Sequence, residues 1–150
     1  MLSRLSVNNY ALIKVLEMEP NPALNIITGE TGAGKSIILG ALGLILGNRA
    51  DSSALLDKSS KCIVEGTFSL DNETFASFFD SNDLDFEKET VLRREVNAKG
   101  RSRAFINDTP VNLNILKDLG NRLVDIHSQH TTLTLNDSNF QLAIIDNFVK

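Results

Sequence analysis

The sequence predicts an α/β fold in which a short strand leads through a glycine-rich loop into a buried helix. Residues 24–28, Leu-Asn-Ile-Ile-Thr, are rich in the β-branched side chains that favour strands. Glycines at positions 29, 32 and 34 follow directly. Residues 36–46 are then apolar nearly all round, as in a helix enclosed by a core. Strand, loop and helix in this order predict a site at the start of the helix.

Hydrophobic periodicity predicts the remaining elements. Residues 5–18 alternate between apolar and polar and indicate one or two strands with a turn near Asn8-Asn9. Asp71 or Asn72 is expected to cap a short helix, and Gly47 suits the C-cap of the helix at 36–46. Gly40 and Gly43 are expected to admit a closely packed backbone. Further strands are expected at 62–70, 90–96, 103–107 and 123–127, and helices at 72–79, 111–119 and 139–149.

The bulk composition is that of an ordinary soluble domain. The chain has 150 residues, of which 42% are hydrophobic and 23% charged, enough to form one core. No apolar run reaches the ~18 residues of a membrane span, and no signal peptide is visible. The lone Cys62 excludes an internal disulfide and favours a reducing, cytoplasmic setting. A net charge of −4 is unlike a dedicated nucleic-acid module, although a local patch can still touch DNA.

The glycine-rich loop fits the pattern G-x-x-x-x-G-K-[ST], the P-loop of nucleotide-binding proteins. Its glycines can adopt positive φ and let backbone N–H groups surround a phosphate, while the following helix presents its positive end. Lys35 is expected to reach the β- and γ-phosphates, and the Ser36 hydroxyl to ligate Mg²⁺. The predicted ligands are therefore ATP and Mg²⁺. The predicted binding residues are Gly29, Glu30, Thr31, Gly32, Ala33, Gly34, Lys35 and Ser36.

A complete NTPase also needs a carboxylate at the end of a second apolar strand. Residues 142–146, Leu-Ala-Ile-Ile-Asp, have a period that suits a helix better. In the other candidate, Asp125 sits inside its apolar run because Ile126 continues it. Neither segment is convincing, so the sequence indicates incomplete catalytic machinery.

Four stretches carry a resemblance to a known family. They are residues 9–13 (NYALI), 27–36 (ITGETGAGKS), 100–107 (GRSRAFIN) and 124–130 (VDIHSQH). The chain resembles, over essentially its whole length, the N-terminal part of the ATPase head of the RecN family. These bacterial DNA-repair proteins are relatives of SMC and Rad50 with an ABC-type nucleotide-binding fold. The usual family pattern has glycine where Ser128 stands.

The resemblance implies an α/β P-loop NTPase: the N-terminal half of an ABC-like head, with an antiparallel β-rich portion and a mixed sheet. Residues 1–138 would form this segment, and 139–150 would begin a helical, coiled-coil arm. The family's signature motif and aspartate-glutamate strand end are missing, so a truncated piece is implied. By the same resemblance Gln129 would contact Mg²⁺ or the attacking water, making Lys35 and Gln129 the candidate catalytic residues, and Ser36 and Gln129 the metal ligands.

The resemblance also implies partners: the C-terminal half of the same head, a second copy, and DNA near the nucleoid. Two other functions stay open, an independent P-loop small-molecule kinase and a non-catalytic, nucleotide-dependent assembly module. Arg93, Arg94, Lys99, Arg101 and Arg103 form a basic run that either touches DNA phosphates or only solvates a hairpin edge. Tyr10 either stacks on adenine or packs in the core, and Arg49 receives no chemical role.

Overall fold

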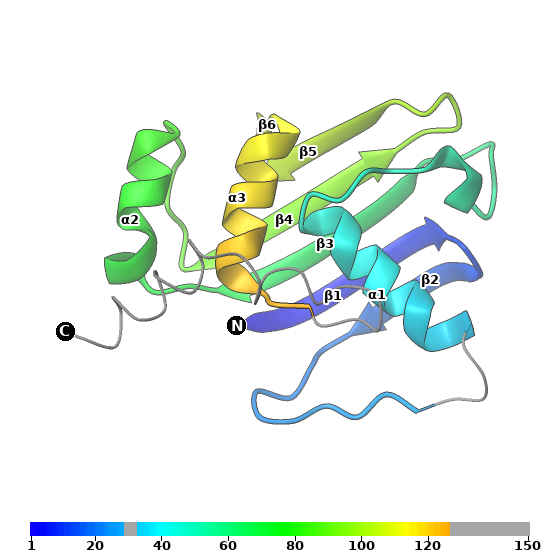
Figure 1. The fold of residues 1–150 in the computed structure, drawn as a ribbon, viewed down its shortest axis with the longest axis horizontal. Helices are drawn as coiled ribbons and strands as arrows, with labels where there is room; N and C mark the ends of the chain where they lie inside the picture. Colours follow the sequence, from blue (N-terminus) through cyan, green and yellow to red (C-terminus); the bar gives the residue numbers. More distant parts are fainter. Residues whose placement is uncertain (29–32, 127–150) are drawn as a thin grey trace, which may run out of the picture.

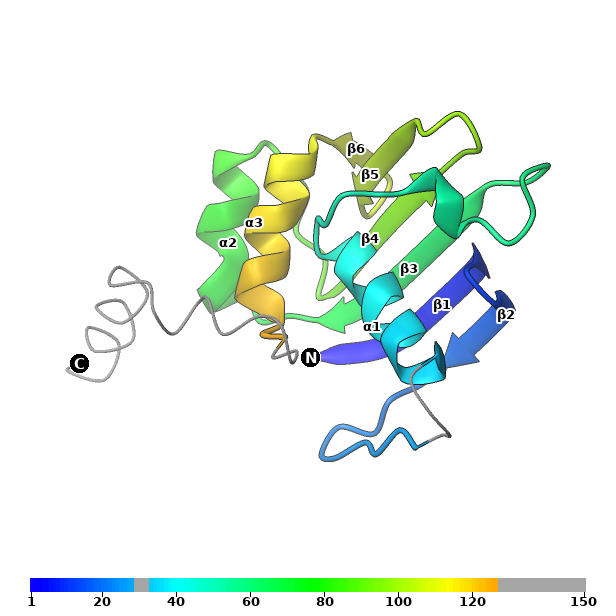
Figure 2. The same cartoon turned by 45° about the vertical axis from the view of Figure 1, so that its right-hand side comes forward.

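The structure, a computed structural model, describes residues 1–28 and 33–126. In this part of the chain, six strands form one antiparallel sheet in the order β2-β1-β3-β4-β5-β6. Helices α1 and α3 lie on one face of the sheet, and α2 stands beside α3 at one end (Figures 1 and 2). The elements are β1 (Leu2–Tyr10), β2 (Ile13–Met18), α1 (Ala33–Ile45), a 3-10 turn η1 (Ser52–Ala54), β3 (Cys62–Ser69), α2 (Asn72–Ser81), β4 (Glu89–Val96), β5 (Ser102–Ile106), β6 (Thr109–Val111) and α3 (Leu113–Leu123).

Most expected elements are confirmed to within a few residues. β3, β4 and β5 lie where alternation predicts strands, and residues 97–101 connect the last two. Asp71 caps α2 by accepting a hydrogen bond from the N–H of Thr74 at 2.8 Å. α1 covers the expected apolar helix, and Gly47 follows it with φ +90°, the left-handed conformation of a helix C-terminus.

The turn between β1 and β2 lies at residues 11–12, beyond the expected Asn8-Asn9. Asn9 adopts φ +56°, which asparagine tolerates better than most residues, and it stays inside β1. Its buried amide explains the placement. Nδ2 donates to the carbonyl oxygens of Asp57 and Ser60 at 2.8 and 3.1 Å, and Oδ1 accepts from the N–H of Asp57 at 2.6 Å. Asn9 therefore ties the end of β1 to the loop before β3.

The strand expected at 24–28 is wrong. These residues form no strand, and the Leu24 and Ile26 side chains are 74% and 76% exposed. A strand needs a neighbour to satisfy its N–H and C=O groups, and no described strand pairs with this segment. Local β-propensity alone therefore does not form a strand here. The described sheet is antiparallel throughout, without the parallel strands of a mixed sheet.

Two predictions near α3 also need correction. The helix expected at 111–119 begins at Leu113, because Thr109–Val111 pair with β5 as β6 and Asn112 caps the helix. The strand expected at 123–127 is wrong in its described part: Leu123 ends α3, and residues 124–126 form no strand. The first apolar residue of the predicted strand, Leu123, is instead the last residue of the amphipathic helix α3. The helix expected at 139–149 lies outside the described residues.

The core lies between the sheet and its helices. Alternate residues of β1, β3 and β4 point into it, among them Leu5, Val64 and Leu92. Cys62 is also buried there, and burial raises the pKa of its thiol to about 11, so it remains a neutral core side chain. The opposite face carries ion pairs such as Arg4–Glu17 and Lys61–Glu95. Across residues 1–28 and 33–126, no helix is long and apolar enough to cross a membrane.

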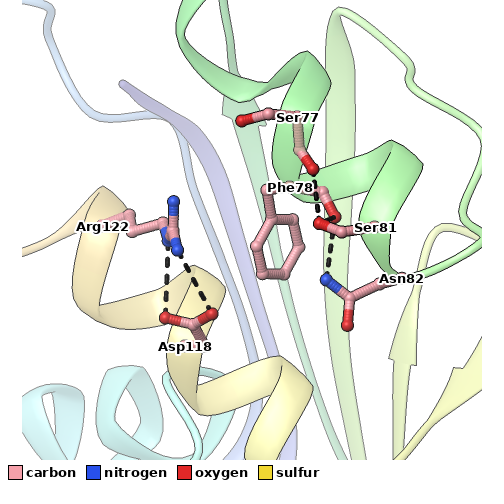
Figure 3. A network of polar contacts seen from close by, with 6 residues as sticks. All are labelled: Ser77, Phe78, Ser81, Asn82, Asp118 and Arg122. Atoms are coloured by element: carbon pink, nitrogen blue, oxygen red, sulfur yellow. Dashed lines mark hydrogen bonds and ion pairs between the residues drawn. The ribbon is translucent and has the colours of Figure 1, made fainter.

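Helices α2 and α3 meet through one aromatic contact (Figure 3). The guanidinium of Arg122 lies 5.2 Å from the centre of the Phe78 ring. Asp118, one turn earlier on α3, pairs with Arg122 at 3.4 Å and orients it. Phe78 and Phe79 on α2 are buried, as the expected apolar face of this helix requires.

The two borders of the sheet differ. β6 has only three residues and contains Pro110, which has no N–H to offer a further strand. β2 forms the other border and is a regular six-residue strand. Its exposed side chains include Val15, which is 62% exposed. The described sheet therefore has one blunted and one regular edge.

We predict that Asn9→Ala lowers the free energy of unfolding by about 2–4 kcal/mol. The change leaves the N–H of Asp57 and the carbonyl oxygens of Asp57 and Ser60 without their Asn9 partner, and alanine tolerates positive φ poorly. Chemical denaturation measures the loss. Asn8→Ala is the matched control, because Asn8 makes no side-chain hydrogen bond within the described residues and should change stability by less than about 0.5 kcal/mol. Equal losses of stability in the two variants would refute the role of Asn9 in tying β1 to the loop before β3.

Candidate phosphate-binding site

The first turn of α1 forms the described part of the predicted phosphate loop. Residues 29–32 lie outside the described part, and α1 begins at Ala33. Gly34, Lys35 and Ser36 are exposed on this first turn. The first turn carries no acidic residue, so the unpaired N–H groups and the Lys35 ammonium create a field that favours anions. The described geometry is compatible with a phosphate at this helix end.

The other end of α1 is anchored to the sheet and to α3. Ala41, Leu44 and Ile45 are buried. A Cβ on Gly66 of β3 would lie 2.4 Å from Cδ1 of Ile45, so glycine at this position lets the Ile45 side chain of α1 pack closely on the sheet. A Cβ on Gly120 of α3 would lie 2.9 Å from the Leu46 Cα. The helix is therefore packed tightly at its C-terminus, whereas Gly34, Lys35 and Ser36 near its N-terminus are exposed.

Gly40 and Gly43 of α1 accommodate side chains, not the expected backbone. A Cβ on Gly40 would lie 2.6 Å from the Tyr10 hydroxyl oxygen, and a Cβ on Gly43 would lie 2.6 Å from Nδ2 of Asn48. Tyr10 is half-buried against the core, and burial raises the pKa of its hydroxyl. Of the two roles open for Tyr10, the structure supports core packing.

A hollow of about 320 Å³ adjoins the first turn of α1. Its lining is mostly apolar and comes from three places: the β1–β2 hairpin, the segment before the loop, and α1. The lining residues are Leu12, Ile13, Leu16, Ile27, Thr28, Gly34, Lys35, Ile37 and Ile38. The volume lies at the small end of ligand sites, and the lining suits an apolar or flat group better than a charged one. We did not predict the hairpin residues as part of the site, although residues 9–13 carried the resemblance.

The other candidate site residues are not brought together by the described structure. Gln129 lies outside the described residues, so its proposed contact with Mg²⁺ or water stays a prediction. Asp125, weighed as a metal-binding carboxylate, is exposed after the end of α3. No group of three His, Cys, Asp or Glu side chains that could hold a metal ion occurs in residues 1–28 and 33–126.

Strand geometry divides the basic run at residues 93–103. Arg94 faces the core and is only 2% exposed, with one hydrogen bond from its guanidinium to the Ser102 hydroxyl at 2.9 Å. Its burial lowers its pKa from the usual value. Arg93 faces the other side, 4.2 Å from the centre of the Phe105 ring and 3.8 Å from carboxylate oxygens of Glu65 and Glu95. The two-residue period of a strand would have predicted that these two adjacent arginines face opposite sides of the sheet.

The comparison with known families agrees with this geometry. A family model described as "AAA domain" matches residues 4–148. The chain belongs to the AAA domain family. This assignment covers the phosphate loop and nearly all of the sequence.

Relatives of this AAA-domain chain confirm the resemblance to RecN. The DNA repair protein RecN of Vibrio cholerae is 45% identical over 149 residues, 99% of this chain. The Haemophilus influenzae and Bacillus subtilis proteins are 41% and 34% identical, each over 99% of the chain. The chain spans only about a quarter of these relatives, 27% of the first two and 26% of the third.

Solved structures confirm the α/β fold class, which this chain shares with SMC head domains. A chain from work on ATP-driven dimerization and DNA-stimulated activation of SMC ATPases matches with a TM-score of 0.67 at 17% identity, covering 99% of both chains. An SMC head bound to the C-winged helix domain of ScpA matches with a TM-score of 0.63 at 22% identity, over 78% of this chain and 38% of that one. At these identities the likeness establishes the fold alone.

We predict that Tyr10 and Gly40 are energetically coupled. Gly40→Ala should raise the free energy of unfolding by about 1 kcal/mol in a Tyr10→Phe background, because alanine favours helix and the nearest ring atom then lies at 3.5 Å. With Tyr10 present, the hydroxyl collides with the new methyl group, so the gain should shrink or reverse. A double-mutant cycle by chemical denaturation measures the coupling. Identical effects in both backgrounds would show that Tyr10 does not pack against Gly40.

Proposed function

We propose that this chain is the ATP-binding N-terminal half of the head of a RecN-like ATPase that acts in DNA double-strand-break repair. One observation carries the proposal: the phosphate-loop motif leads into the open, positive end of α1, while the other end of α1 is anchored to the sheet. Relatives named DNA repair protein RecN share this region at 34–45% identity. The kinase alternative has no comparable support.

The residues present fit ATP and Mg²⁺. A Cβ on Gly34 would meet nothing within 4 Å, so the first turn of α1 is uncrowded, and Lys35 and Ser36 are exposed beside it. The backbone of residues 29–34 and the Lys35 ammonium would hold the phosphates. The Ser36 hydroxyl, with Gln129, would hold the metal ion. Bound nucleotide supplies a phosphoanhydride whose cleavage can drive a change in assembly.

We expect this chain not to hydrolyse ATP by itself. Hydrolysis needs groups that hold Mg²⁺ and orient water, and no convincing strand-end carboxylate occurs in the sequence. In the complete protein, two heads would sandwich ATP, with the phosphate loop of each facing the signature motif of the other. Binding would close the dimer and hydrolysis would open it, gating a clamp on nucleoid DNA. ATP-driven dimerization named for a matching SMC structure supports this sequence of events.

Exposed apolar side chains support a partner that completes the head. Leu24, Ile26 and Ile27 precede the phosphate loop and are 74%, 76% and 44% exposed, and Leu39 on α1 is 44% exposed. Exposed apolar residues concentrated at one place mark a contact surface. The C-terminal half of the same head is the proposed partner, because relatives are almost four times as long as this chain.

We predict that Lys35→Ala in the complete protein reduces ATP binding below detection and leaves the fold intact. The substitution removes the ammonium that would pair with the β- and γ-phosphates, a charge-assisted contact that nothing nearby replaces. Calorimetric titration with ATP, together with a thermal melt, measures both quantities. Lys88→Ala, a lysine at the far end of the sheet, is the matched control. Unchanged ATP affinity in the Lys35 variant would defeat the nucleotide assignment.

We also predict that Leu24→Ser with Ile26→Ser destabilises the complete protein but not this chain alone. In the isolated chain both side chains are exposed, so little apolar burial is lost. In the complete head their burial would contribute about 1.5–3 kcal/mol each. Thermal melts of both forms test the difference, with Leu56→Ser as control because Leu56 is also exposed but lies away from the loop. Equal melting changes in the two forms would contradict the proposed covering.

A further inference from the structure

Exposed acidic and basic side chains gather at opposite ends of the sheet, although the whole chain has a net charge of −4. β3 and β4 pair over their full lengths, so Ser69 and Glu89 lie at one end, and Cys62 and Val96 at the other. Eight residues at ~3.4 Å each separate these ends by roughly 25 Å. Figures 1 and 2 show α2 at the first end and the β4–β5 hairpin at the second.

The end that holds α2 is strongly acidic. Residues 71–89 contain seven carboxylates and one lysine. Six of the carboxylates are exposed: Asp71, Asp80, Asp83, Asp85, Glu87 and Glu89. This end therefore repels polyanions.

The opposite end, which we call the hairpin end, gathers cations from two loops. Five are exposed and make no ion pair within the described residues: Arg49, Lys58, Lys99, Arg101 and Arg103. A Cβ on Gly100 would lie 4.0 Å from the Ser52 hydroxyl oxygen, so the hairpin tip adjoins the segment that follows Arg49. The two loops that carry these cations are thus in contact at this point.

The carboxylates at the hairpin end accept hydrogen bonds from nearby serines or form ion pairs with other cations. Asp51 accepts from the N–H of Ser53 at 2.8 Å, and Asp57 accepts from the N–H and hydroxyl of Ser59 at 2.8 and 2.7 Å. Glu95 pairs with Lys61 at 3.2 Å and with Arg93 at 3.8 Å. Asp51 and Asp57 keep their negative charge, since their hydrogen-bond donors are neutral, but the five cations outnumber these two carboxylates. The side chains at this end that form no ion pair in the described residues therefore carry a net positive charge.

Both loops are held in defined shapes. In the hairpin, Oδ1 of Asn97 accepts from the N–H groups of Lys99 and Arg101, each at 3.0 Å. In the other loop, Asn9 clamps the backbone at Asp57 and Ser60. Because the backbone is fixed, less ordering is needed when the side chains bind a ligand.

We propose that the hairpin end binds the sugar-phosphate backbone of duplex DNA, with Lys99 and Arg101 at the tip making phosphate contacts. This inference rests on the proposed function in DNA repair. Several lysines and arginines near one another match a line of phosphates without requiring any base sequence. The acidic end of a second copy is the other anion available. That pairing would be head-to-tail and open-ended, so it fits a closed assembly less well.

The test uses the complete protein with two matched double variants. Lys99→Gln/Arg101→Gln removes two charges at the hairpin tip, and Arg4→Gln/Lys88→Gln removes two exposed cations near the opposite end of the sheet. Fluorescence anisotropy with a labelled 40-base-pair duplex of mixed sequence, at several KCl concentrations, gives affinity and its salt dependence. ATP affinity, thermal melting and sedimentation are measured on the same samples.

The hairpin variant should bind the duplex at least about tenfold more weakly at ~0.1 M salt, with the slope of log K against log salt smaller by about two. Its ATP affinity and melting temperature should match those of the parent, and the control variant should bind DNA like the parent. Equal DNA affinity and salt slope in the two variants would overturn the proposal. A changed oligomeric state of the hairpin variant with normal DNA affinity would also overturn it and favour the second copy. If the unsubstituted parent bound no ATP, that result would instead count against the proposed function.

Discussion

Ile45 of α1 lies over Gly66 of β3, where even a methyl group would collide with it. The position of the predicted phosphate loop depends on this contact, because the loop leads directly into α1. Gly120 lets α3 approach the end of α1 equally closely. Together the two contacts hold one end of the helix while its first turn stays open. A firmly packed helix with an exposed first turn is what anion binding by backbone N–H groups requires.

The sequence predicted best those elements that are stabilised by their own neighbours. β3 and β4 alternate regularly and pair with each other, and α2 carries both its cap and its apolar face within ten residues. The phosphate motif was recognisable because its residue spacing is set by the ligand and not by the fold. The family resemblance then supplied the head architecture that the solved structures confirm.

Predictions failed where distant contacts decide local structure. Residues 24–28 have the composition of a strand but no pairing strand among the described residues, so they form no strand and are exposed. The β1–β2 turn lies later in the sequence than predicted because the Asn9 amide binds a loop about fifty residues away. Gly40 accommodates the Tyr10 hydroxyl, a contact that no pattern within α1 reveals. The opposite orientations of Arg93 and Arg94 follow from strand alternation, which we had not applied to the basic run.

The unequal borders of the sheet have a consequence for assembly. Pro110 stops the sheet from growing beyond β6, whereas β2 ends the described sheet as a regular strand. The exposed segment 24–28 follows β2 after a short connection and leads straight into the phosphate loop. Any polypeptide that pairs with the β2 edge would therefore also contact segment 24–28, which leads into the phosphate loop. A polypeptide that docks at β2 would then also change the shape of the phosphate loop. Partner binding and phosphate binding would therefore be energetically coupled, each changing the affinity for the other.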